Sequence, residues 1–176
     1  MAATITATLE SATANSYVTL AEANTFFETV PDSTTWDSKT DDQKNRALIS
    51  ACSELDSLNY YGYRCNEDQA LKWPRNNHEV DGVSFACTTI PRNIKEAQYL
   101  LARELANDPT LMTGNKGTAG VAKKIKMGDL EIENAEASLA TGTVNNIFDV
   151  LPWLHQKLGA YCVGGSGSYQ VRVVRG

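Results

Sequence analysis

Residues that could support acid–base, nucleophilic or metal chemistry are few in this chain. His78 and His155 are its two histidines, so a Ser-His-Asp or Cys-His set would have to use one of them. The chain contains no H-E-x-x-H and no G-x-S-x-G motif. His78 falls in a polar loop, where we expect a surface position, and His155 falls in a helix beside Trp153. The sequence therefore predicts no enzyme activity and no cofactor.

The four cysteines follow no metal or redox motif. They are Cys52, Cys65, Cys87 and Cys162. None belongs to a C-x-x-C pair, so the spacing supports neither a zinc site nor a thioredoxin-type site. Cys52 lies on an apolar helix face, which favours a small core residue. The N-terminus has no basic segment before an apolar run, which predicts synthesis in the cytosol with reduced thiols.

Two groups of aromatic and basic residues could hold single-stranded DNA. They are Tyr60, Tyr61, Tyr63 and Arg64 in the first group and Lys123, Lys124 and Lys126 in the second. Nucleic-acid bases stack on aromatic faces, and basic side chains neutralise phosphates. A second interpretation is that the tyrosines cover the end of the preceding helix and close the core.

The overall charge argues against binding to duplex DNA. The 176 residues carry a net charge of −5, whereas a duplex-DNA binder usually has a basic surplus or a basic face. The glycines around Lys116 do not form a phosphate-binding P-loop, because that motif needs G-x-x-x-x-G-K-[ST] between a strand and a helix. No segment approaches the roughly 20 apolar residues of a membrane span. We expect a single globular domain with no membrane contact.

Capping motifs predict where the first two long helices begin. Thr19 with Glu22 and Thr40 with Gln43 each fit a capping box, in which two side chains satisfy unpaired backbone N–H groups. Trp36, between these helices, is expected in a polar linker at the edge of the core. The side of the second helix that we expect to face solvent carries Asp41, Asp42, Lys44 and Arg46.

A central helix is expected from Pro91 to Asp108. Proline suits the first helical turn, and the Asp108-Pro109 pair ends the helix because proline cannot continue it. The helix is expected to pack on two sides. Its apolar stripe contains Ile94, Ala97, Leu101 and Leu105.

A β-hairpin is expected at residues 121–134, followed by a helix at 144–160 that restarts or kinks at Pro152. Apolar and polar residues alternate on both sides of the Gly128-Asp129 turn. One strand is basic and the other is acidic, so Lys–Glu pairs across the strands would support the register. The residues of this hairpin that we expect at a subunit interface are Lys123, Lys124, Lys126, Glu131 and Glu133.

Both ends of the chain are expected to be extended arms. Residues 1–18 show a weak strand pattern, with a frayed terminus as the alternative. Residues 163–176 begin with a glycine-rich spacer and end in a segment of strong β propensity. Such a strand tends to join another sheet edge, and a disordered tail is the alternative. The residues expected to bind the portal or a neighbouring subunit are Tyr169, Val171, Arg172, Val173, Val174 and Arg175.

Together these elements predict a mainly α fold, a small helical bundle with an inserted β-hairpin and extended N- and C-terminal arms. We expect one domain. Its parts are the N-terminal arm at 1–18, the helical core at 19–112, the hairpin at 121–134, the C-terminal helix at 144–160 and the C-terminal arm at 163–176. A two-stranded hairpin is marginal by itself in water, so we expect it to pack on the helices or on a neighbouring subunit, and we expect the C-terminal strand to find a partner in another molecule.

Several strings of residues resemble one known family. They are A-N-S-Y-V-T-L-A-E-A at 14–23, Q-A-L-K-W-P-R at 69–75, Ile90-Pro91 with Ala97, the basic and acidic hairpin at 123–133, and R-V-V-R-G at 172–176. Over nearly its whole length the chain resembles the small head–tail adaptor proteins of tailed bacteriophages, also called connector or head completion proteins. Many relatives carry the label DnaT-like single-stranded-DNA-binding protein.

The resemblance implies a structural protein of the virion neck, made in the host cytoplasm. It implies a homo-oligomeric ring of about twelve subunits docked beneath the portal protein, with tail or stopper proteins bound below. DNA would pass through the ring without sequence-specific binding. The acidic charge suits such a conduit, which must not retain DNA. The alternative function is a single-stranded-DNA-binding module.

Overall fold

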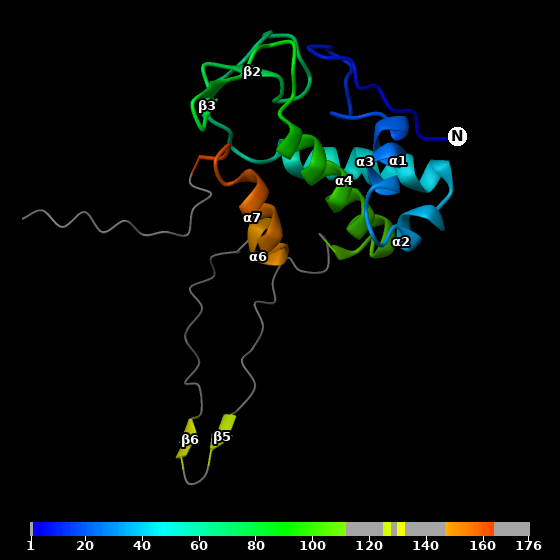
Figure 1. Cartoon of the computed structure of the whole chain (residues 1–176), viewed down its shortest axis with the longest axis vertical. Helices are drawn as coiled ribbons and strands as arrows, with labels where there is room; N and C mark the ends of the chain where they lie inside the picture. Colours follow the sequence, from blue (N-terminus) through cyan, green and yellow to red (C-terminus); the bar gives the residue numbers. More distant parts are fainter. Residues whose placement is uncertain (1, 112–124, 128–129, 133–146, 164–176) are drawn as a thin grey trace, which may run out of the picture.

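Helices are the main regular secondary structure in the part of the chain that the structure describes, and the fold is mainly α with an inserted hairpin, as the sequence predicts (Figure 1). The computed structural model describes residues 2–111, 125–127, 130–132 and 147–163. The helices are α1 (Leu20–Glu28), α2 (Thr34–Asp37), α3 (Asp41–Asp56), α4 (Arg92–Asn107), α6 (Ile147–Val150) and α7 (Pro152–Leu158). The antiparallel strand pairs are β1 (Tyr63–Arg64) with β2 (Arg75–Asn76), β3 (Glu79–Val80) with β4 (Val83–Ser84), and β5 (Ile125–Met127) with β6 (Leu130–Ile132).

Both predicted capping boxes are present. At the start of α1 the Thr19 hydroxyl accepts a hydrogen bond from the Glu22 N–H, and the Glu22 carboxylate accepts one from the Thr19 N–H. Thr40 and Gln43 begin α3 in the same way. A capping residue of this kind stabilises a helix by about 1 kcal/mol, which explains why purely local signals place these two helix starts correctly.

The central helix, α4, packs mainly against α3 and also against α7 and α2. This confirms the prediction that it packs on more than one side. The predicted stripe of Ile94, Ala97, Leu101 and Leu105 is buried, and burying one such large apolar side chain contributes about 1.5–3 kcal/mol. The helix ends just before Pro109, at the place where its missing N–H prevents continuation.

Trp36 is more central than the sequence predicts. It lies in the short helix α2 rather than in a linker, and its side chain is fully buried. The indole N–H donates a hydrogen bond of 2.9 Å to Asn24 Oδ1. The Lys44 ammonium lies over the ring, 5.5 Å from its centroid. Lys44 is therefore buried rather than solvated, because its stem and charge cover an aromatic face.

The N-terminal arm follows neither the strand prediction nor its frayed alternative. Residues 2–18 form no strand, yet their backbone is held by hydrogen bonds to side chains. Ala3 N donates to Asp42 Oδ1 at 2.8 Å, and Asn45 Nδ2 donates to Ala3 O at 2.9 Å. Asn15 Oδ1 accepts a bond of 2.8 Å from Thr6 N. The strand prediction is wrong because these side chains and isolated backbone bonds, such as that from Ala70 N to Ser11 O at 3.0 Å, hold the arm in place of a neighbouring strand.

The arm ends at a buried amide of α4. Tyr17 N donates to Gln98 Oε1 at 3.2 Å, and Gln98 Nε2 donates to Leu48 O of α3 at 2.9 Å. Gln98 is fully buried. A buried amide with satisfied groups fixes one arrangement of its neighbours, so this contact orders the arm on the helices.

Helices α6 and α7 form the described part of the helix expected at 144–160. Leu151 separates them, and Pro152 is the first residue of α7, which confirms the predicted restart. Residues 161–163 then run antiparallel to residues 59–61, with Tyr60 opposite Cys162. Residues 164–176, the rest of the predicted C-terminal arm, lie outside the described residues.

Strands β5 and β6 form the predicted hairpin between α4 and α6. Their register places Lys126 opposite Glu131, the pairing that the basic and acidic strands predict. Figure 1 draws the two strands apart from the helical bundle. The turn and the outer parts of the predicted hairpin lie outside the described residues.

Candidate interface: the aromatic lobe and the hairpin

Residues 59–89, which we call the aromatic lobe, connect α3 to α4 and contain β1 to β4 (Figure 1). A two-residue turn, Asp81-Gly82, joins β3 to β4. Both residues have positive φ, 54° and 77°, as the two-residue turn of a tight hairpin requires. The sequence does not predict strands β1 to β4, because a strand of two residues is too short to show an alternation of polar and apolar residues.

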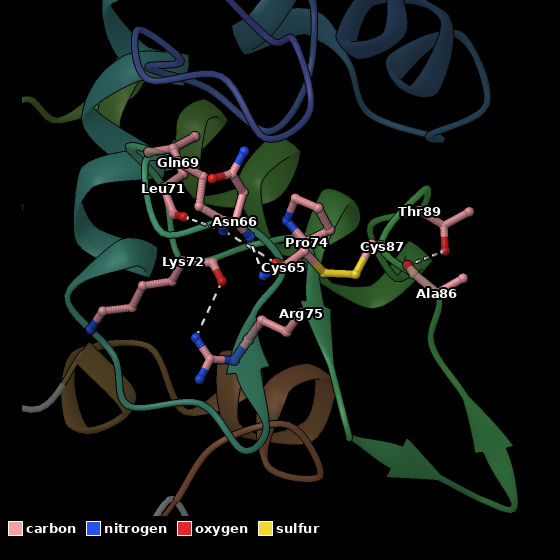
Figure 2. The surroundings of a disulfide bond; sticks show 10 residues. All are labelled: Cys65, Asn66, Gln69, Leu71, Lys72, Pro74, Arg75, Ala86, Cys87 and Thr89. Atoms are coloured by element: carbon pink, nitrogen blue, oxygen red, sulfur yellow. Dashed lines mark hydrogen bonds between the residues drawn. A yellow bond between two sulfur atoms is a disulfide. The ribbon is translucent and has the colours of Figure 1, made fainter.

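Arg75 is the buried centre of the lobe. Its Nε donates a hydrogen bond of 2.7 Å to Tyr61 O, and its Nη2 donates to Tyr60 O at 3.3 Å and to Gly62 O. Nη1 donates to Lys72 O at 3.2 Å, as Figure 2 shows. One guanidinium therefore holds three consecutive carbonyl groups, which its planar fork of donors allows and a lysine would not.

His78 is enclosed by aromatic rings. It stacks on Tyr61 and on Phe85, with ring centroids 5.8 Å and 6.0 Å apart. Trp73 and Tyr161 approach it at steeper angles. The expectation of a surface histidine is wrong, since only 8% of His78 is exposed. Burial, followed by the charge of Arg75, lowers its pKa below the ordinary value.

The three tyrosines near the start of the lobe have different environments. Tyr60 is buried, and its hydroxyl donates a bond of 2.8 Å to Leu55 O at the end of α3. Tyr61 and Tyr63 are 46% and 67% exposed. The interpretation that the tyrosines close the core therefore holds for Tyr60 alone. The other two rings, with the exposed Arg64 beside them, remain available to a ligand.

A disulfide joins Cys65 to Cys87 across the lobe (Figure 2). Their Cα atoms are 5.6 Å apart, within the usual range for a disulfide. The expectation of reduced thiols is therefore wrong for this pair, because the chain folds back and brings two distant cysteines together. Cys52 and Cys162 are free and buried, and burial raises the pKa of each thiol to about 12. Cys52 is a core residue, as predicted.

Carboxylates neutralise many basic side chains of the helical bundle. The ion pairs are Arg46–Asp42, Arg92–Glu96, Lys95–Glu22, Arg103–Glu104 and Lys157–Glu96, at 2.6–2.9 Å. Partial burial acts to raise the pKa of Glu96, but hydrogen bonds from Lys157 and Arg92 hold it below its ordinary value. Paired cations are poor sites for phosphate, so these helices offer little positive surface to DNA.

The sequence-predicted interface residues fall mainly beyond the described ranges. The structure describes the backbone of Lys126 and Glu131 and pairs them. Lys123, Lys124 and Glu133 of the hairpin lie outside the described residues. So do Tyr169, Val171, Arg172, Val173, Val174 and Arg175 of the C-terminal arm.

Arg75 and the Cys65–Cys87 disulfide are the site features that sequence patterns missed. The string Trp73-Pro74-Arg75 marks the place, since the arginine directly follows two apolar residues in a loop. Nothing in the spacing of the four cysteines distinguishes the two that form the disulfide from the two that are free. In the described residues, no group of three His, Cys, Asp or Glu side chains could hold a metal ion, and no helix is long and apolar enough to cross a membrane.

The model of one protein family matches residues 1–176, and that family is described as "Putative DnaT-like ssDNA binding protein". The chain belongs to this family. The DnaT-like match covers the helices, the aromatic lobe and the hairpin segment alike. No curated protein and no solved structure matches the chain.

Proposed function

We propose that this DnaT-like chain is a structural head-to-tail adaptor of a tailed-phage virion. It would form a ring of about twelve subunits that joins the portal to tail or stopper proteins around the DNA channel. The strings at residues 14–23 and 69–75, which resemble such adaptors, support the proposal. Assembly, not catalysis, is the mechanism.

The observation that carries the proposal is the hairpin of β5 and β6. It has three residues in each strand, and Figure 1 draws it apart from the bundle. A two-stranded hairpin of this size is marginal in water without further packing. A neighbouring subunit or the portal would supply the missing contacts, and Lys126 and Glu131 would lie at that interface.

The ion pairs of the bundle agree with the same role. Arg92 and Lys157 both bind Glu96, and Lys95 binds Glu22. With a net charge of −5, a ring of such subunits would repel DNA in its channel and let it pass.

Electron microscopy of the purified protein mixed with the portal encoded by the same genome tests the adaptor role. We expect rings on the portal for the full chain. Replacing residues 121–134 by a short Gly-Ser linker should abolish the rings and leave the helical circular-dichroism signal unchanged. A second variant that lacks residues 164–176 should fold but fail to join portals. If both variants still form rings on the portal, the adaptor mechanism is wrong.

A second candidate function is single-stranded-DNA binding, which the family description favours. Tyr61 and Tyr63 expose their rings, and Arg64 is exposed next to them. Stacking of a base on an aromatic ring contributes about 1–3 kcal/mol, so two rings and one guanidinium could hold a short segment of DNA. Lys123, Lys124 and Lys126 would extend this site along the phosphates.

Fluorescence anisotropy with a labelled oligothymidylate tests the second candidate. Binding should weaken as salt rises from about 50 to 200 mM, because phosphate contacts release counterions. Tyr61→Ala and Tyr63→Ala should each weaken binding about fivefold or more. Val83→Ala, at an exposed apolar residue of the same lobe, is the control and should have no effect. A flat titration of the full chain would eliminate this candidate.

A further inference from the structure

The Cys65–Cys87 bond joins a firmly held segment of the aromatic lobe to a weakly held one. On the first side, Gln69 Oε1 accepts hydrogen bonds from Cys65 N at 3.1 Å and Asn66 N at 3.0 Å. The Gln69 side chain is buried and also donates to Leu71 O at 2.6 Å. This network fixes Cys65 whether or not its sulfur is bonded.

The second side has no comparable network of side-chain hydrogen bonds and is held by the ring contacts of His78 and Phe85 with Tyr61, Trp73 and Tyr161. Residues 76–89 are mostly exposed, and in this segment only His78 is buried. Two residue pairs join β3 to β4, and Phe85 N donates to His78 O at 3.3 Å. Cys87 lies in a turn that Thr89 closes on Ala86 O. Besides the ring contacts of His78 and Phe85, the disulfide attaches the end of this segment near Cys87 to Cys65, next to β1.

We propose that the Cys65–Cys87 disulfide is a redox-controlled clamp on the aromatic lobe. In the oxidised protein it holds residues 76–89 against residues 59–75 of the lobe, so that Phe85 and His78 support the exposed ring of Tyr61. Reduction releases this segment and leaves the helical bundle folded. The inference does not depend on which partner the lobe binds.

The reaction is a thiol–disulfide exchange with a small-molecule disulfide such as oxidised glutathione. One cysteine thiolate attacks a glutathione sulfur, forms a mixed disulfide and expels a glutathione thiolate. The second cysteine thiolate then attacks the protein sulfur of the mixed disulfide and expels the second glutathione thiolate. Two electrons pass from the protein to glutathione, and the two protons end on the two glutathione thiols.

The surroundings of the four cysteines make the exchange specific. Cys65 and Cys87 are half-buried, so a small thiol can reach their bond. Cys52 and Cys162 are buried in the core, so neither competes for the bond. The clamp lies in the aromatic lobe, outside the helical bundle. Helix α4 packs on α3, α7 and α2, so the bundle has its own contacts that do not involve the disulfide.

Hydrogen–deuterium exchange of the full-length protein with and without dithiothreitol tests the clamp. We expect amides in residues 76–89 to exchange about tenfold faster or more after reduction, while those of α3 and α4 are unchanged. Maleimide labelling followed by mass spectrometry should add two labels on reduction, at Cys65 and Cys87. The endoprotease Glu-C should then cleave after Glu79.

The double variant Cys65→Ser/Cys87→Ser is the matched control. Its amide exchange should equal that of the reduced wild type and should not change when dithiothreitol is added. Because the wild type is measured in both redox states, the test stands even if this variant fails to fold. Two labels on protein treated with oxidised glutathione would overturn the proposal, since no bond would have formed. Unchanged exchange at 76–89 on reduction, or loss of α3 and α4 together with the lobe, would also overturn it.

Discussion

Gln98 Nε2 and Ser16 Oγ lie 2.7 Å apart in the core, although the two residues are 82 positions apart in the chain. The hydrogen bond between them ties the N-terminal arm to the middle of α4. Ser16 is buried and also donates to Val18 O at 2.6 Å. This buried polar network therefore fixes the position of the arm on α4.

Replacing Gln98 with leucine should destabilise the whole fold. The change roughly keeps the volume but leaves the buried Tyr17 N without an acceptor, which costs about 1–3 kcal/mol. Urea unfolding, followed by circular dichroism, measures this change in the free energy of unfolding. The control is Gln156→Leu at an exposed position of α7, where a change below about 0.5 kcal/mol is expected. Equal effects of the two substitutions would contradict the role given to Gln98.

Arg75→Lys should loosen the lobe more than the bundle. A single ammonium cannot replace the guanidinium at the carbonyls of Tyr60, Tyr61 and Gly62, so we expect a loss of about 2–4 kcal/mol in local stability. Hydrogen exchange of residues 59–64 measures this loss. Arg64→Lys, on the exposed neighbour, should change nothing. Protection of 59–64 that survives Arg75→Lys would refute the assignment.

The stability of the fold should fall on mild acidification because of His78. Burial among rings, and then Arg75, lower the pKa of His78 in the folded protein. The unfolded chain therefore takes up this proton at a higher pH. The stabilising effect of the neutral ring is complete above the unfolded pKa of about 6.5, starts to fall as pH drops below that value, and is lost once pH has fallen through the lower pKa of the folded protein.

Melting temperatures at several pH values check this prediction. The wild type should lose stability between about pH 7.5 and pH 5.5, and His78→Phe should respond less in that range. Glu22 and Glu96 have lowered pKa values, so they stay ionised there and do not confuse the result. Parallel profiles for wild type and variant would disprove the contribution of His78.

Glu96→Gln should weaken the contact between α4 and α7 by a small amount. Glu96 binds Lys157 of α7 at 2.6 Å and Arg92 at 2.6 Å, but Arg92 is 87% exposed. Solvent screening limits the loss to about 0.5–1 kcal/mol, and added salt should reduce it further. Denaturant unfolding at low and high salt measures the effect, with the exposed Glu28→Gln as the control. A loss that is independent of salt would point to packing instead.

Local signals predict the helices, and long-range contacts decide the rest. The starts of α1 and α3 follow from Thr19 and Thr40, because a capping box is complete within four residues. The environment of His78 could not be predicted, since its rings come from separate segments that include Tyr161. The hydrogen bonds of Arg75 and the disulfide depend in the same way on how the chain folds back. The hairpin register was predictable because alternation and the turn fix it together.

The pairing of residues 59–61 with 161–163 has a mechanical consequence. Val163 N donates to Asn59 O at 2.8 Å, and Tyr61 N donates to Tyr161 O at 3.0 Å. Tension applied to the chain beyond Val163 would load these two bonds before it stretched α7. A pull on the C-terminal end would therefore be transmitted through these bonds to the segment that carries Tyr61, and from Tyr61 O to the guanidinium of Arg75.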